Sequence, residues 1–184
     1  MAQIEANIMY WIQENLRAPF LNGFASVLGM AGELGILWIV LTLILMAKKK
    51  TRRLGIFCGI SILLTFITVT LIIKPIVNRP RPYAMFDYLT TVGIVPHDSS
   101  FPSGHASNAF ACAWVLFRKD RRRLGIPALI VAILISLSRV FCGIHYPSDV
   151  LCGALIGIIM SEVSIRAFRR PVKKLFKRFP KLRG

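Results

Sequence analysis

Three short polar segments in an otherwise apolar chain carry residues that could hold and cleave a phosphate ester. They span 74–82, 102–105 and 138–149 and together contain one lysine, three arginines, two histidines and one aspartate. Lysine and arginine bind phosphate oxygens, and histidine transfers protons near neutral pH. Because ionisable residues are costly among membrane-spanning helices, these segments indicate a functional site.

The first segment places Lys74 and Arg81 in a K-x6-R-P pattern. Arginine offers a planar fork of donors to phosphate and lysine offers a compact charge. Pro80 and Pro82 stiffen the backbone that carries Arg81. The structural alternative is that these cations, and Arg79 in particular, extend to lipid headgroups at the end of a helix.

The second segment, Pro102-Ser103-Gly104-His105, opens a predicted helix. Backbone N–H groups at a helix N-terminus suit an anion, and Gly104 permits close approach of a ligand. The Ser103 hydroxyl adds a donor, and His105 could serve as a general acid. The alternative is an ordinary helix cap followed by a solvent-facing histidine.

The third segment contains the pattern S-R-x5-H-x3-D, formed by Ser138, Arg139, His145 and Asp149. A nucleophilic histidine needs a carboxylate that holds its tautomer and stabilises its charged form, and Asp149 can supply one. Asp149 could equally cap the helix that follows. The two roles are compatible.

The rest of the chain predicts an all-α integral membrane protein. Hydrophobic residues make up 55% of the 184 residues, and the mean hydropathy is +0.61. We expect a bundle of five transmembrane helices, with six as the alternative if residues 19–32 also cross the bilayer. An interfacial helix is expected over 3–17, and the expected spans are 30–47, 54–73, 103–117, 124–140 and 150–168.

The distribution of charge predicts the orientation of these spans. Of the 24 basic residues, 19 lie in the clusters 48–53, 118–123 and 166–183. Basic loops favour the cytoplasmic side of a membrane, so the loops at 74–102 and 139–149 are expected on the opposite, extracytoplasmic side. All candidate site residues then share one membrane interface. Little charge remains for a nucleic-acid surface, and we expect no nucleic-acid partner.

The four cysteines lack metal-ligand spacing. Cys58, Cys112 and Cys152 lie in apolar runs and are expected to be structural thiols. Cys142 lies in a predicted external loop, where a disulfide is the alternative.

Together and in this order, the three segments resemble the type 2 phosphatidic acid phosphatase superfamily, whose K-x6-R-P, P-S-G-H and S-R-x5-H-x3-D motifs are matched without departure between Lys74 and Asp149. The resemblance implies a membrane phosphatase domain over 1–168, followed by a basic cytoplasmic tail over 169–184. It also implies activity without a metal or another cofactor.

The resemblance also implies a role for each matched residue. His145 would attack phosphorus and form a phosphohistidine, Asp149 would orient its ring, and His105 would protonate the leaving oxygen. The phosphate would be bound by Lys74, Arg81, Ser103, Gly104 and Arg139.

The expected substrate is a lipid phosphate or diphosphate. Outward-facing chemistry and small size are similar to those of bacterial family members that recycle undecaprenyl diphosphate. The alternative is a monophosphatase acting on phosphatidylglycerophosphate or phosphatidic acid, since the motifs do not separate these substrates. Anionic membrane lipids are expected partners of the basic tail. Two rival interpretations are a non-catalytic lipid binder and a vanadium haloperoxidase, whose site is similar but whose chain is soluble.

Overall fold

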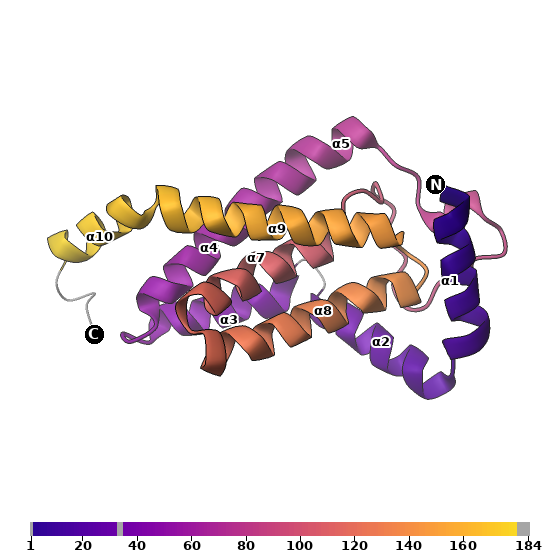
Figure 1. Cartoon of the computed structure of the whole chain (residues 1–184), viewed down its shortest axis with the longest axis horizontal. Coiled ribbons are helices and arrows are strands. Elements are labelled where there is room, and N and C mark those ends of the chain that lie inside the picture. The colour runs from indigo at the N-terminus through magenta and orange to yellow at the C-terminus, as the bar shows by residue number, and fades with distance from the viewer. Residues whose placement is uncertain (1, 33–34, 180–184) are drawn as a thin grey trace.

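The computed structural model describes residues 2–32 and 35–179, and all regular structure in these residues is helical (Figure 1). The expected all-α class is therefore confirmed. Its helical elements are α1 (Ala2–Leu16), α2 (Pro19–Gly32), α3 (Ile36–Ala47), α4 (Arg52–Phe66), η2 (Ile67–Ile73), α5 (Lys74–Val77), α6 (Pro82–Met85), α7 (Gly104–Lys119), η3 (Arg121–Gly125), α8 (Ile126–Phe141), α9 (Pro147–Ala167) and α10 (Arg169–Arg178).

The long helices lie side by side, with α7 at the centre of the bundle. Helix α7 packs against α3, α4, α8 and α9. Figure 1 shows α1 lying across one end of this bundle, while α10 continues from α9 at the other end. The helix expected over 3–17 is thus present as α1, and it covers the end at which the three polar segments meet.

Helices α7 and α9 approach each other closely because α9 presents glycines to the backbone of α7. A Cβ atom at Gly157 would lie 2.3 Å from the carbonyl oxygen of Ser107, and one at Gly153 would lie 2.6 Å from that of Ser103. Small residues allow such contact between helices in a membrane, where packing replaces the hydrophobic effect. The close approach holds the start of α7 beside the start of α9.

Buried hydroxyl groups add polar contacts within the same packing. The hydroxyl oxygens of Ser61 and Ser161 lie 3.1 and 2.6 Å from the carbonyl oxygen of Ala111. The hydroxyl of Ser164 donates to the carbonyl oxygen of Phe57 at 3.1 Å. These contacts join α4, α7 and α9 through groups that hydrocarbon would otherwise leave unsatisfied.

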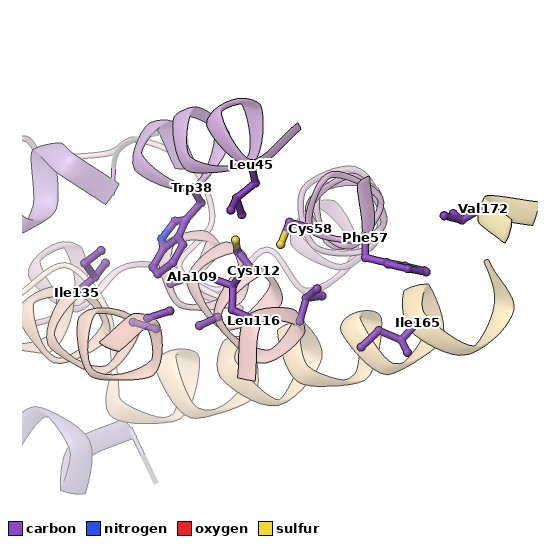
Figure 2. Close-up of a cluster of buried hydrophobic side chains, with 14 of the residues drawn as sticks. Trp38, Leu45, Phe57, Cys58, Ala109, Cys112, Leu116, Ile135, Ile165 and Val172 are labelled. Atoms are coloured by element: carbon purple, nitrogen blue, oxygen red, sulfur yellow. The ribbon is translucent and has the colours of Figure 1, made fainter. Parts of the chain in front are cut away.

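The largest apolar cluster fills the half of the bundle nearer α10. Figure 2 shows Trp38 and Phe57 packed with side chains from α7, α8 and α9. The sulfur atoms of Cys58 and Cys112 point toward each other inside this cluster. All four cysteines are free thiols, including Cys142, which is 1% exposed. The structure thus has no disulfide at Cys142.

Among residues 2–32 and 35–179, three helical runs are long and apolar enough to span a bilayer, namely Arg52–Met85, Arg121–Phe141 and Pro147–Ala167. Helices α2 and α3 meet at 51° and together could form a fourth. The span expected over 103–117 is the central helix α7, of 16 residues. Residues 33–34 of the span expected over 30–47, and residues 180–184 of the tail, lie outside the described residues.

The α7–α9 contact predicts the effect of a minimal substitution. Gly157→Ala should lower the melting temperature in detergent, because the added carbon meets backbone atoms that cannot rotate away. Overpacking of this kind costs about 1–3 kcal/mol, more than the ~1 kcal/mol gained in helix propensity.

Gly23→Ala in α2 is the matched control, since a Cβ there meets nothing within 4 Å. Its melting temperature should stay equal or rise. An equal rise in both variants, measured by thermal unfolding, would contradict the close α7–α9 packing.

Candidate active site

The three polar segments meet around one cavity of about 170 Å³. Lys74 begins α5, Arg81 directly precedes α6, and His145 lies between α8 and α9. Gly104 and His105 form the first turn of α7. The cavity is lined by Lys74, Arg81, Asp98, Gly104, His105, Asn108 and His145, with Gly32, Gly35, Phe66, Thr70 and Pro96 completing its wall.

His145 lies in the cavity wall with 2% of its surface exposed. Its Nδ1 atom lies 3.5 Å from Oδ2 of Asp149 and 3.5 Å from the hydroxyl oxygen of Ser100. Its Nε2 atom lies 3.5 Å from Nη1 of Arg81. Since Asp149 lies on the Nδ1 side, Nε2 is the nitrogen placed to react with a group held by Arg81.

Asp149 is fully buried and accepts several short hydrogen bonds. Oδ2 accepts from the Ser100 hydroxyl at 2.5 Å and from the Tyr146 backbone N–H at 2.9 Å. Oδ1 accepts from Arg79 at 2.6 Å. A buried carboxylate requires such partners, and this set fixes its position beside His145.

Arg79, for which lipid headgroups were the structural alternative, contacts the residues that surround His145. Its guanidinium donates to Asp149, to the Ser148 hydroxyl at 2.8 Å and to Glu5 at 2.8 Å, and it stacks 3.8 Å from the centre of the Tyr146 ring. Through these contacts Arg79 links α1 to the start of α9.

Burial lowers the pKa of His145 from 6.5 to about 4. The hydrogen bond with Asp149 opposes this change, while the positive charges of Arg81 and His105 add to it. His145 is consequently neutral at pH 7. A neutral imidazole has the free lone pair that a nucleophile needs.

Asp98 lies between the two cations that the sequence assigned to phosphate. Its carboxylate forms an ion pair with Lys74 and another, at 2.5 Å, with Arg81. Burial would raise the pKa of Asp98, but its hydrogen bonds and the charges of Lys74 and Arg81 bring the pKa below its ordinary value. An anion entering the cavity must compete with this carboxylate.

The Arg81–Asp98 pair also separates the cavity from a second hollow. This outer hollow of about 400 Å³ is lined by Arg81 and Asp98 together with His97 and Tyr83. The Asp98 side chain is 56% exposed, so it can leave the cations and be solvated at modest cost. Asp98 belongs to none of the three sequence motifs.

Ser103 and Gly104 occupy different positions at the start of α7. A Cβ atom at Gly104 would meet nothing within 4 Å, so the space in front of this residue is open. The Ser103 side chain is buried, caps α7 by accepting from the Ala106 N–H at 3.4 Å, and does not line the cavity. Gly104 is therefore placed to meet a ligand directly, whereas Ser103 positions the helix.

Arg139 does not line this cavity. Its guanidinium donates to the Ala25 carbonyl oxygen of α2 at 3.2 Å and to the Ser138 hydroxyl at 3.0 Å. It lines a separate small hollow beside Gly29, where any Cβ would lie 1.9 Å from its Nη2 atom. Of the three cations predicted to bind phosphate, Lys74 and Arg81 line the cavity in the described structure, and Arg139 does not.

A family model described as the PAP2 superfamily matches residues 53–173, which include all three motifs. The chain belongs to the PAP2 superfamily. The family resemblance inferred from the motifs is thereby confirmed.

Two curated relatives and one solved structure show how similar this chain is to known proteins. The undecaprenyl-diphosphatase of Sulfolobus acidocaldarius is 33% identical over 156 residues, covering 84% of this chain and 75% of the relative. Phosphatidylglycerophosphatase B of Bacillus subtilis is 28% identical over 175 residues, covering 86% and 80%. The structure of Aquifex aeolicus LpxE superposes with a TM-score of 0.77 at 29% identity, covering 87% of this chain and 93% of that one.

The low pKa of His145 predicts a pH-dependent loss of stability. The unfolded chain binds a proton near pH 6.5, whereas folded His145 binds one only near pH 4. Stability is therefore lost as the pH falls through this window. Melting temperatures of wild type and His145→Asn, compared at about pH 7 and about pH 5, should show a smaller decrease for the variant. Equal decreases would show that His145 does not titrate in this way.

The position of Asp98 predicts that Asp98→Asn binds inorganic phosphate more tightly. Removing a charge that competes for Lys74 and Arg81 should raise the affinity about tenfold, equivalent to roughly 1.4 kcal/mol. Titration calorimetry on the detergent-purified protein would measure the change.

Asp87→Asn is the control, because Asp87 is exposed in the same loop and makes no ion pair within the described structure. It should leave the affinity unchanged. Weaker phosphate binding in Asp98→Asn would mean instead that the carboxylate orients the cations for the ligand.

Proposed function

We propose that this protein is a membrane lipid phosphatase that hydrolyses a lipid phosphate or diphosphate through a phosphohistidine intermediate. The observation that carries the proposal is the meeting of two histidines, His105 and His145, with Lys74 and Arg81 around one cavity in an apolar helical bundle. Membership of the PAP2 superfamily and similarity to lipid phosphatases support a phosphatase.

In the first step, Nε2 of His145 attacks phosphorus, so that a P–N bond forms as the P–O bond to the leaving group breaks. His105 donates a proton to the leaving oxygen, which departs as an alcohol from a monoester or as a lipid monophosphate from a diphosphate. Asp149 stabilises the positive charge that develops on the His145 ring.

In the second step, a water molecule attacks the phosphohistidine. His105, now neutral, accepts a proton from the water, the P–N bond breaks, and inorganic phosphate leaves. Both residues return to their starting protonation states. The proposed cycle requires no metal ion, so chelators should leave the rate unchanged.

Positive groups stabilise the charge that spreads over the phosphoryl oxygens in each step. Lys74, Arg81 and the backbone N–H of Gly104 face the cavity and can do so once Asp98 has withdrawn. Arg139 would have to leave its contacts with α2 to contribute. Its role and that of the Ser103 hydroxyl remain predictions.

Among lipid substrates, we favour undecaprenyl diphosphate. The undecaprenyl-diphosphatase of Sulfolobus acidocaldarius, at 33% identity over 84% of this chain, supports this choice. The similarity to phosphatidylglycerophosphatase B supports the alternative, a monophosphatase for phosphatidylglycerophosphate or phosphatidic acid.

We also propose that the chain crosses the membrane five times and that its active site faces the extracytoplasmic side. Lys74 begins α5 and His105 lies in the first turn of α7, at the end of the bundle opposite the basic clusters 48–53 and 118–123. Since such clusters favour the cytoplasm, the opposite end would face outward.

The central test is the substitution His145→Ala. Phosphate release should fall by at least about a thousandfold, because the nucleophile is lost, and wild type but not the variant should acquire an acid-labile phosphoryl group from labelled substrate. His97→Ala is the matched control, since His97 is exposed and does not line the catalytic cavity. Undiminished turnover by His145→Ala would overturn the mechanism.

The same assay separates the two substrate classes. We expect faster release from undecaprenyl diphosphate than from undecaprenyl phosphate, phosphatidylglycerophosphate or phosphatidic acid, each presented in the same detergent. A strong preference for the monoesters would establish the alternative.

A further inference from the structure

A second positively charged cavity lies at the end of the bundle far from the catalytic cavity. Arg53 lies in the first turn of α4 and Lys74 begins α5 on one continuous helical run, which separates the two ends by about 30 Å at 1.5 Å per residue. The second cavity has a volume of about 810 Å³. The basic side chains that line it come from four segments, and they are Lys50, Arg53, Arg118, Lys119, Arg166 and Arg169.

Acidic groups near this cavity balance only part of its charge. Glu162 pairs with Arg118 at 2.8 Å and with Arg166 at 3.1 Å. Asp120, the acidic residue in the lining, accepts from the backbone N–H of Arg123 at 3.4 Å. Within the described residues, four lining cations form no ion pair, namely Lys50, Arg53, Lys119 and Arg169.

An unbalanced group of cations around a hollow favours an anion with several oxygens. The like charges repel one another, and an anion between them would relieve that repulsion. The positive-inside bias accounts for basic residues on this side of the membrane. It does not require them to surround a shared cavity.

An apolar groove adjoins the cationic cavity. This groove, of about 270 Å³, lies between α3 and α8 and is lined almost entirely by aliphatic side chains and Trp38. Leu124 lines both the groove and the cationic cavity. A ligand that filled both would need a charged head joined to a hydrocarbon chain.

Helix α10 holds one wall of the cavity in place. It buries Val172 and Phe176 against the bundle and so positions Arg169, its first residue. On its other side Leu175 and Phe179 are 40% and 49% exposed. An amphipathic helix with this composition suits a membrane surface rich in anionic lipid.

We propose that this end of the protein contains a binding site for an anionic phospholipid, distinct from the catalytic site. The lipid phosphate would lie among the four unbalanced cations, and one acyl chain would lie in the groove beyond Leu124. Binding to the folded protein alone would stabilise it by mass action.

Native mass spectrometry on the full-length protein in detergent tests the site with two lipids of identical acyl chains. Wild type should retain phosphatidylglycerol at least about tenfold more than phosphatidylcholine, whose choline cancels the phosphate charge. The double variant Arg53→Gln/Arg169→Gln should lose that preference, together with any rise in melting temperature that phosphatidylglycerol causes.

The double variant Lys49→Gln/Arg122→Gln removes the same charge from exposed positions outside the cavity and should keep the preference. An equal loss in both variants would show diffuse attraction to surface charge and overturn the proposal. Displacement of the lipid by millimolar inorganic phosphate alone would also overturn it, because the ligand would then be a soluble anion.

The outcome does not depend on catalysis. Arg53→Gln/Arg169→Gln should still release phosphate from lipid substrate in detergent, since both positions lie far from His145. Loss of lipid retention with activity intact supports the second site even if the proposed substrate is wrong.

Discussion

A buried carboxylate at the end of an apolar bundle is the constraint on which the site depends. Asp149 has no exposed surface, and an unpartnered charge there would cost several kcal/mol. Its partners therefore determine the local structure. The Ser100 hydroxyl, the Tyr146 N–H and the Arg79 guanidinium all donate to it. Satisfying this one group draws the loop before α7, the start of α9 and the segment after α5 to the same place.

The same need for partners extends to the N-terminal helix. One terminal nitrogen of the Arg79 guanidinium donates to Asp149 and the other donates to Glu5. Glu5 also accepts from the Ser148 N–H at 2.8 Å. Helix α1 thus contributes a second carboxylate, which accepts from the guanidinium nitrogen that does not donate to Asp149. This gives α1 a reason to lie across the bundle at this end, beyond the burial of its apolar face.

The sequence predicted which residues gather at the site better than it predicted their contacts. Residue types and spacing were enough to place His105 and His145 at one cavity, because helix ends on one side of a bundle share an interface. The contacts of Arg79 and Asp98 could not be predicted, because they depend on side-chain geometry in the folded chain. Arg139 shows the converse: it is part of a matched motif, yet its guanidinium contacts α2. The number of crossings stays a prediction, because α7, which corresponds to the span expected over 103–117, has only 16 residues.

Two carboxylates near the cavity differ in a way that suits turnover. Asp149 is buried and strongly hydrogen-bonded. Moving its carboxylate would break several hydrogen bonds at once, and one new contact would not compensate for that loss of free energy. Asp98 neutralises Lys74 and Arg81 from a side chain that is 56% exposed, so water can replace those contacts. Without Asp98, two adjacent cations would face each other in a small cavity and repel. With it, the cations stay in place until a phosphate, which brings more charge and more oxygens, displaces the weaker anion. In the proposed mechanism, such a site would hold the nucleophile His145 in place while the proposed phosphate-binding groups, Lys74 and Arg81, stay exchangeable.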